Sequence, residues 1–171
     1  MVAHDTFPGA TGWSSNSPLA VTYCGDAIGP MLGGYNVFGR STYVEKDFNL
    51  SAAPPHSLVR VELDFIKIDS WDRGEFAQVV VDGEIAWSQE LAGSSGVQEC
   101  GRTNHRWHEL VVPVTTDVAS SRELATVRVT TNLNSHANDE SWGMQNVRVS
   151  VAIGPPSTPP PPALPPPPPS P

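Results

Sequence analysis

The sequence has few basic residues and no long apolar segment. Of its 171 residues, 10 are Lys or Arg and 18 are Asp or Glu, so the formal net charge is −8. So acidic a chain is a poor partner for nucleic acid or an anionic membrane surface. No apolar run approaches the length of a transmembrane helix, so no membrane insertion is expected. The N-terminus, MVAHDTFPG, lacks the basic and apolar regions of a signal peptide.

Motifs that identify common catalytic sites are also missing. The chain has no G-x-S-x-G, no Walker loop and no C-x-x-C pair. A glycoside hydrolase needs two carboxylates on either side of a sugar. Asp69 or Asp72 together with Asp139 or Glu140 could supply them, but no feature marks one carboxylate as acid and another as base. We therefore predict a protein that is not an enzyme, with a carbohydrate-active enzyme as the second alternative.

Cysteine is scarce as well. Cys24 and Cys100 are the two cysteines, and in a secreted protein we expect them to form a disulfide, whereas in the cytosol both would be buried thiols. The bridge would close a long loop, worth about 4.5 kcal/mol as an upper figure from chain entropy. Asn49-Leu50-Ser51 is an N-glycosylation acceptor, which agrees with secretion.

The C-terminal segment 155–171, PPSTPPPPALPPPPPSP, contains no charge, no aromatic residue and no glycine. Consecutive prolines fix φ and remove backbone donors, which favours a polyproline II rod of about 50 Å. We predict a folded head over 1–154 and a stalk over 155–171. A disordered linker or an SH3-type ligand are the alternatives, although no Arg or Lys flanks the PxxP stretches.

Short alternating segments separated by Gly-, Ser- and Pro-rich loops dominate the head. The strongest expected strands cover 59–65, 76–81, 84–88, 107–114, 124–131 and 145–153. Asp82-Gly83 predicts a type I′ hairpin turn between the second and third of these strands. Asp117 to Leu124 is the single helix-like stretch. We predict an all-β fold, an antiparallel jelly-roll-like β-sandwich with a C-terminal polyproline II tail.

Two loops combine carboxylates with a Ser-Trp pair. They are Asp69-Ser70-Trp71-Asp72 followed by Glu75, and Asn138-Asp139-Glu140-Ser141-Trp142. Carboxylates gathered in one place repel each other unless a cation lies between them, and Ca²⁺ takes its ligands from such oxygens. We predict that both loops meet at one end of the sandwich. The expected metal ligands are Asp69, Asp72, Glu75, Asp139 and Glu140, and the expected glycan contacts are Trp71, Trp142 and Asn138.

The same residues allow a structural alternative. The two tryptophans would fill the core, and the acids would cap turns or pair with Arg60, Arg73 or Arg128. Neither loop has EF-hand spacing, which favours this alternative. His105 and His108 would point to opposite faces of a strand, so we expect no zinc site from this pair.

The tail resembles the hydroxyproline-rich stalks of pherophorin- and extensin-like cell-wall glycoproteins of algae and plants. The head resembles a β-sandwich module of large extracellular proteins of green algae and ciliates. That resemblance rests on Gly33-Gly34-Tyr35, Pro54-Pro55-His56, Phe65 through Trp71, Val81-Asp82-Gly83, Cys100-Gly101 and Asn138 through Gly143. The signature is I-D-S-W-D-x-E followed by D-E-S-W-G, and here Arg73-Gly74 adds one residue before Glu75. The resemblance implies a secreted module of a cell surface or matrix.

Our functional prediction is a structural or adhesive module of a cell-wall, matrix or flagellar-surface glycoprotein. The alternative is a calcium-dependent, lectin-like carbohydrate-binding domain. The expected partners are glycans, other cell-surface glycoproteins and the polyproline II rods of neighbouring chains. Ca²⁺ is the one cofactor that the residues suggest.

Overall fold

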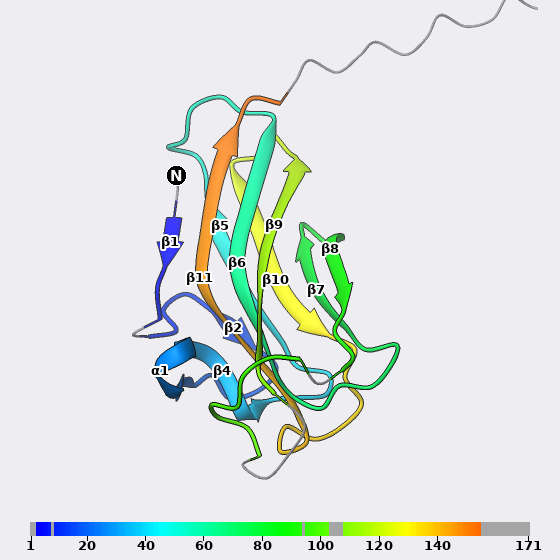
Figure 1. Cartoon of the computed structure of the whole chain (residues 1–171). Coiled ribbons are helices and arrows are strands. Elements are labelled where there is room, and N and C mark those ends of the chain that lie inside the picture. Colours follow the sequence, from blue (N-terminus) through cyan, green and yellow to red (C-terminus); the bar gives the residue numbers. More distant parts are fainter. Residues whose placement is uncertain (1–2, 8, 94, 103–107, 155–171) are drawn as a thin grey trace, which may run out of the picture.

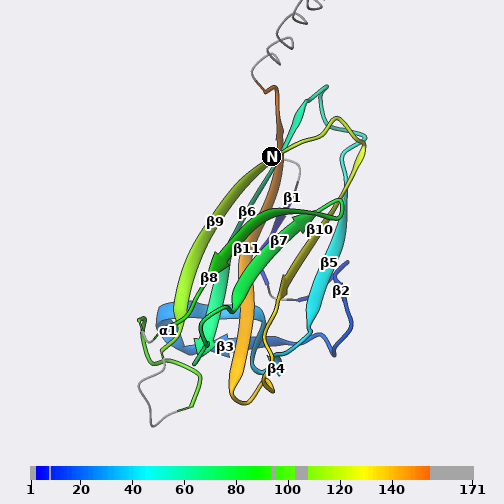
Figure 2. The same cartoon turned by 90° about the vertical axis from the view of Figure 1, so that its right-hand side faces the viewer.

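The head is a sandwich of two antiparallel β-sheets packed face to face (Figure 1). A computed structural model describes residues 3–7, 9–93, 95–102 and 108–154. The view turned by 90° shows the two layers with α1 at the lower end (Figure 2). This architecture confirms the predicted all-β sandwich. The described residues include no helix that is long and apolar enough to cross a lipid bilayer. The predicted polyproline II stalk and His105 lie outside the described residues.

The first sheet has six strands, in the order β3-β4-β11-β6-β9, with β1 also paired to β11. β11 contacts β4 through 142–144 and β1 through 147–149, so two strands share one of its edges. A register shift between Gln145 and Arg148 separates the two pairings. The strands of this sheet are β1 (Ala3–Asp5), β3 (Val21–Cys24), β4 (Gly29–Phe38), β6 (Leu58–Asp69), β9 (Leu110–Ala119) and β11 (Glu140–Ala152).

The second sheet has five strands, in the order β2-β5-β10-β7-β8. Asp82 and Gly83 have φ of 52° and 89°, as the predicted type I′ turn requires, and they join β7 to β8. The strands are β2 (Ser14–Ser15), β5 (Tyr43–Asn49), β7 (Phe76–Val81), β8 (Glu84–Glu90) and β10 (Leu124–Thr131). The predicted bounds of β7 and β10 match the observed ones.

The main core lies between the two sheets. It is built from alternate residues of each strand, because successive side chains of a strand point to opposite faces. In β10 the inward positions 125, 127 and 129 are fully buried. The fully buried members of this core include Phe38, Phe65, Leu32, Met144 and Trp142.

A second cluster of buried residues lies on the other side of the six-stranded sheet, and we call it the outer core. Its members are Cys24, Ile28, Met31, Ile66 and Ile68. It is covered by the short helix α1 (Gly25–Ile28) and by the disulfide between Cys24 and Cys100, which confirms the predicted bridge. Because β6 contributes to both cores, its residues 65–69 are all buried.

Two local predictions were wrong, and one helix was not predicted. Residues 117–119 continue β9 and Leu124 opens β10, so the expected helix is a strand–turn–strand connection. The observed helix is α1, whose four residues are too few for a periodic signal. The strand predicted over 145–153 ends one residue early, because β11 ends at Ala152, and Ile153 is 83% exposed.

Candidate functional site

Trp71 and Trp142 come together inside the main core. Both pack on Phe65, with ring centroids 5.9 and 5.5 Å apart, respectively. Trp71 Nε1 donates a hydrogen bond of 3.2 Å to the carbonyl oxygen of Ser141. The predicted proximity of the two Ser-Trp motifs is confirmed. The predicted glycan contact is wrong for this conformation, because Trp71 and Trp142 are 2% and 0% exposed and present no free indole face.

Glu75 and Glu140 form a buried carboxylate pair at the end of the main core. Their side chains are 3% and 4% exposed. Glu75 Oε2 accepts the N–H of Asp72 at 2.5 Å, and Glu140 Oε2 accepts the N–H of Ser135 at 3.1 Å. Glu75 Oε1 has no hydrogen-bond partner among the described residues. Burial and the charge of Glu140 raise the pKa of Glu75 to about 7, although the hydrogen bond from the Asp72 N–H acts to lower it.

A second pair of buried carboxylates, Asp69 and Glu109, holds the loop that carries Cys100. Glu109 accepts the N–H groups of Glu99, Cys100 and Gly101, at 2.5, 3.2 and 3.2 Å. Asp69 Oδ1 accepts the N–H of residue 102 at 2.9 Å. Four consecutive backbone donors therefore converge on two carboxylates. A side chain at position 101 would overlap both of them, so glycine is required there.

Lys67 is the buried cation of this second pair. Its Nζ donates to the carbonyl oxygen of Asp69, and its side chain is 1% exposed. Burial raises the pKa of Asp69 and lowers the pKa of Lys67, because both charged forms lose hydration. Lys67 and Glu109 were not predicted to be polar core residues. Each stands in an alternating or mixed segment, where no pattern distinguishes a buried charge from an exposed one.

The five predicted calcium ligands do not gather around one point. Asp69 contacts the Cys100 loop, Glu75 and Glu140 form their own pair with Asp72 beside them, and Asp139 pairs with Arg102 at 2.9 Å on the surface. Within the described ranges, the one group of three potential metal ligands is Cys24, Cys100 and Glu109, and its two sulfurs are joined as a disulfide. The five acids therefore occupy three places, mostly as caps of backbone N–H groups.

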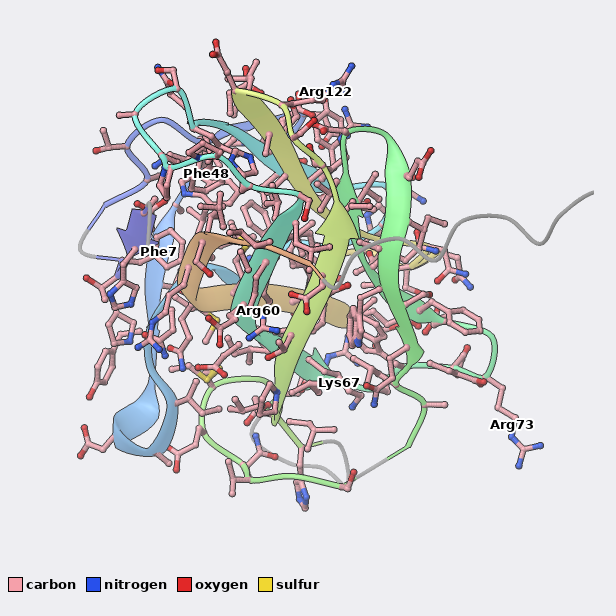
Figure 3. The ribbon with its side chains drawn as sticks, turned by 90° about the horizontal axis from the view of Figure 1, so that it is seen from above. Phe7, Phe48, Arg60, Lys67, Arg73 and Arg122 are labelled. Atoms are coloured by element: carbon pink, nitrogen blue, oxygen red, sulfur yellow. A yellow bond between two sulfur atoms is a disulfide. The ribbon has the colours of Figure 1, made fainter. Side chains whose placement is uncertain are left out.

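The structural alternative was right about the caps but named the wrong arginines. Arg60 and Arg128 pair with Asp117 and Glu45 instead of the motif acids. Arg73 points outward at the edge of the molecule (Figure 3). Asn138 takes part through its backbone oxygen, which accepts a 3.4 Å bond from the hydroxyl of Tyr35. No described contact gives its side chain a role in binding.

Asn49 remains a predicted glycosylation site. It is exposed at the end of β5. Its side-chain oxygen accepts the N–H of Ser51 at 2.9 Å.

The outer face of the five-stranded sheet carries a hollow that the sequence analysis did not single out. Its volume is about 360 Å³. The alternation of β10 turns residues 126, 128 and 130 outward, and the register places Arg128 between Glu45 of β5 and Val80 of β7. The lining residues are Tyr43, Glu45, Val80, Gly83, Thr126, Arg128 and Thr130.

Arg128 is fixed at the centre of this hollow. Its Nε and one Nη donate to Glu45 Oε2 at 2.9 and 2.7 Å, and its guanidinium carbon lies 4.2 Å from the ring centroid of Tyr43. Both side chains of the ion pair are partly exposed, 42% for Arg128 and 28% for Glu45. A guanidinium that lies over an aromatic ring and is ion-paired is preorganised to hydrogen-bond a ligand.

Threonine hydroxyls flank the arginine along β10. Thr126 Oγ1 donates to Asp47 at 2.6 Å, and Thr130 Oγ1 donates to the carbonyl oxygen of Thr42 at 3.0 Å. Each hydroxyl oxygen keeps an acceptor site toward solvent. The alternation of β10 could have identified this row of outward polar residues. The partner strands, which decide whether the row forms a site, could not be read from the same pattern.

No family model matches the chain, and no curated protein matches it. Among solved structures, the chain is similar to xylanase 10B of Clostridium thermocellum, a structure of CBM22-1 and GH10 modules in complex with xylohexaose. The identity is 13% and the TM-score 0.56, over 90% of this chain and 28% of that chain. This chain therefore spans little more than a quarter of the xylanase chain, and the match establishes a shared fold.

Two smaller proteins are also similar. One is a family 35 carbohydrate-binding module from an environmental isolate, at 12% identity and a TM-score of 0.49, over 90% of this chain and 99% of that chain. The other is the carbohydrate-binding module CBM36 in complex with calcium and xylotriose, at 12% identity and a TM-score of 0.41, over 81% of this chain and 98% of that chain.

Proposed function

We propose that the head is a non-catalytic carbohydrate-binding module. The observation that carries this proposal is the hollow on the five-stranded sheet, where Arg128 lies on Tyr43 beside Glu45. Sugars are bound through hydroxyl groups and through the apolar faces of their rings, and this surface offers hydrogen-bonding groups beside an aromatic side chain. The fold shared with a chain that contains a carbohydrate-binding module agrees with this function.

Catalysis is not part of the proposal. The hollow contains one carboxylate, Glu45, and it is ion-paired with Arg128, whereas glycoside hydrolysis needs two carboxylates placed across the scissile bond. The close pair Glu75 and Glu140 is buried and out of reach of a polysaccharide. Turnover of a bound polysaccharide by the purified protein would contradict this part of the proposal.

A glycan microarray with the full chain tests the proposal, followed by calorimetric titration of the glycans that bind. Arg128→Ala and Tyr43→Ala should each weaken binding at least about tenfold, the loss expected for one hydrogen bond to a charged group or one aromatic contact. Arg60→Ala is the matched control, because Arg60 forms a similar bidentate pair with Asp117 on the six-stranded sheet. Equal loss in the control, or no glycan bound by the wild type, would refute the proposed site.

Calcium dependence is a separate proposal, tested by repeating the titration in chelator. A calcium ion held by this head would use the Glu75–Glu140 pair, because Glu75 Oε1 is buried there and has no hydrogen-bond partner among the described residues. That pair lies at the end of the core and the hollow lies on a sheet face. We therefore expect calcium to change stability more than glycan affinity.

The biological setting that we propose is extracellular. The disulfide favours an oxidising compartment, and the Pro-rich tail resembles a cell-wall stalk. In that setting the head would attach the chain to a polysaccharide of a wall, matrix or flagellar surface, which makes the structural or adhesive role a consequence of glycan binding. Pull-down of the secreted protein by isolated wall material, and its loss in Arg128→Ala, tests this role.

A further inference from the structure

The hydrogen-bonding groups of the hollow include both donors and acceptors. Arg128 uses two of its five N–H groups on Glu45 Oε2, so further N–H groups are left for a ligand. Glu45 Oε1 accepts no hydrogen bond from the described residues, so it is left for a donor. A hydroxyl group both donates and accepts, whereas a carboxylate or sulfate ligand can only accept. The mixed pattern fits a hydroxyl group.

The charge around the hollow also favours an uncharged ligand. The described cations on this side of the sheet are already paired with carboxylates: Arg128 with Glu45, and Arg122 with Asp82 of the turn beside Gly83. Asp47, on the same face of β5 as Glu45, adds a negative charge that has no ion-pair partner among the described residues. An anionic glycan would meet carboxylates while the described cations around the hollow are already paired, and such like-charge contacts are costly.

Apolar side chains extend the site across the sheet. Val80 of β7 lies beside Arg128, and Ile85 of β8 lies beside Val80 with 61% of its surface exposed. The row from Glu45 to Ile85 crosses four strands and is about 14 Å long at the usual strand spacing. This length exceeds one sugar ring, so a chain of several sugars can cover the row.

From these observations we propose that the site selects uncharged polysaccharide chains, lying across the strands from β5 to β8, over uronic-acid or sulfated ones. This inference rests on the proposed carbohydrate-binding function and names the chemical class of its ligand. The Arg128–Glu45 pair is its specificity-determining element, because Glu45 both neutralises the arginine and supplies an acceptor.

Calorimetric titration of the full chain with neutral and anionic hexasaccharides tests the selection. Xylohexaose, cellohexaose and laminarihexaose are the neutral probes, and hexagalacturonate and a sulfated galactan hexasaccharide are the anionic ones. At least one neutral probe should bind about tenfold more tightly than either anionic probe. Its affinity should change little between about 0.05 and 0.5 M salt, because no net ion pair forms. Xylose, glucose and galactose alone should bind more weakly than the hexasaccharides.

Glu45→Gln provides the second arm. The substitution leaves Arg128 without its counter-charge, so the preference for neutral over anionic probes should shrink about tenfold, through a gain for the anionic ones. Asp117→Asn is the matched control, because it frees Arg60 on the other sheet in the same way, and the preference should stay unchanged. The melting temperature of each variant, measured alongside, shows that the head is folded.

The outcomes separate this inference from the proposed function. Binding of an anionic probe more tightly than every neutral one would overturn the inference and leave the carbohydrate-binding function standing. Unchanged preference in Glu45→Gln would overturn the role of the Arg128–Glu45 pair. The absence of any glycan ligand, on the array and in calorimetry, would refute the proposed function and the inference with it.

Discussion

The head contains two cores of very different size on the two faces of one sheet. The main core fills the space between the sheets and contains most of the buried apolar side chains. The outer core has five buried members and is covered by the short helix α1 (Gly25–Ile28) and the Cys24–Cys100 disulfide. Small clusters bury too little apolar area to hold themselves together, and disulfides are the usual supplement. We infer that the disulfide lies at the outer core because this smaller core needs the additional stabilisation.

The two cores also end differently. One end of the main core is closed by Glu75 and Glu140, two buried carboxylates that lie close together. The edge of the outer core is closed by a covalent bond and by Glu109, which accepts three backbone N–H groups of the loop beside Cys100. A change in the protonation of Glu75 should therefore act on the first core, and reduction of the disulfide on the second.

The largest expected effect is in the main core. Trp142→Ala should cost about 3–5 kcal/mol of unfolding free energy, because it leaves a cavity between the sheets. Ile68→Val is the contrast in the outer core and should cost about 0.5–1.5 kcal/mol. Both costs are measured by urea denaturation with the disulfide intact. A cost of Trp142→Ala no larger than that of Ile68→Val would show that Trp142 does not fill a tightly packed core.

Removal of the disulfide should come next. Cys24→Ala with Cys100→Ala should cost about 2–5 kcal/mol. Hydrogen exchange should rise in 25–28 and 99–102 more than in β10, because the bridge holds the outer core and not the strands of the main core. Loss of protection that is equal in both cores would contradict this separation.

Acidity should act on the main core with a smaller effect. The folded-state pKa of Glu75, about 7, lies above the ordinary value of 4.5, so the folded state binds this proton more tightly than the unfolded state. Its contribution to stability is complete below about pH 4.5 and is lost as the pH rises through 7. The melting temperature of the wild type should therefore fall across this range relative to Glu75→Gln, which keeps the shape but cannot lose a proton.

The exposed Glu84 supplies the control for this titration. Glu84→Gln changes the net charge by the same amount without touching the core, so its melting temperature should follow the pH dependence of the wild type. Identical pH profiles for the wild type and Glu75→Gln would show that the Glu75–Glu140 pair does not titrate in this range.

The smallest effect belongs to the segment beyond the sandwich. Truncation after Gly154 should change the melting temperature by no more than about 1 °C, because 155–171 offers little apolar surface beyond Ala163 and Leu164. Glycan affinity in solution should stay the same, whereas retention on wall material should fall if the tail contacts similar rods. A large loss of stability would show that the tail belongs to one of the two cores.

The main core could be predicted from the sequence, whereas the outer core could not. Alternation in β7 and β10 predicted both strands with their bounds, because each has one buried face. In β6 the alternation ends at Phe65, since Ile66 and Ile68 are covered from the other side by residues far away in the sequence. A short helix and a disulfide loop create that cover, and neither has a periodic pattern.

Part of the candidate site could likewise be predicted from the sequence, and part could not. The acidic Ser-Trp motifs were correctly expected to meet, because both stand at the lower ends of neighbouring strands. Their role could not be predicted, since whether a tryptophan lies in a core or on a surface depends on what the opposite sheet brings. The hollow around Arg128 required the pairing of β5, β10 and β7, and strand order is decided by the whole fold.

The position of β11 has a mechanical consequence. β11 is paired with β6 from Glu140 to Ala152, with a register shift between Gln145 and Arg148, and the described residues end at Gly154, two residues after the strand. A pull on the C-terminal segment acts along this strand, and hydrogen bonds between antiparallel strands run across it. The bonds along the strand are then loaded together in shear instead of opening one at a time. A head that is tethered through the end of β11 and bound to a polysaccharide through its five-stranded sheet would therefore resist tension applied along β11, its longest strand.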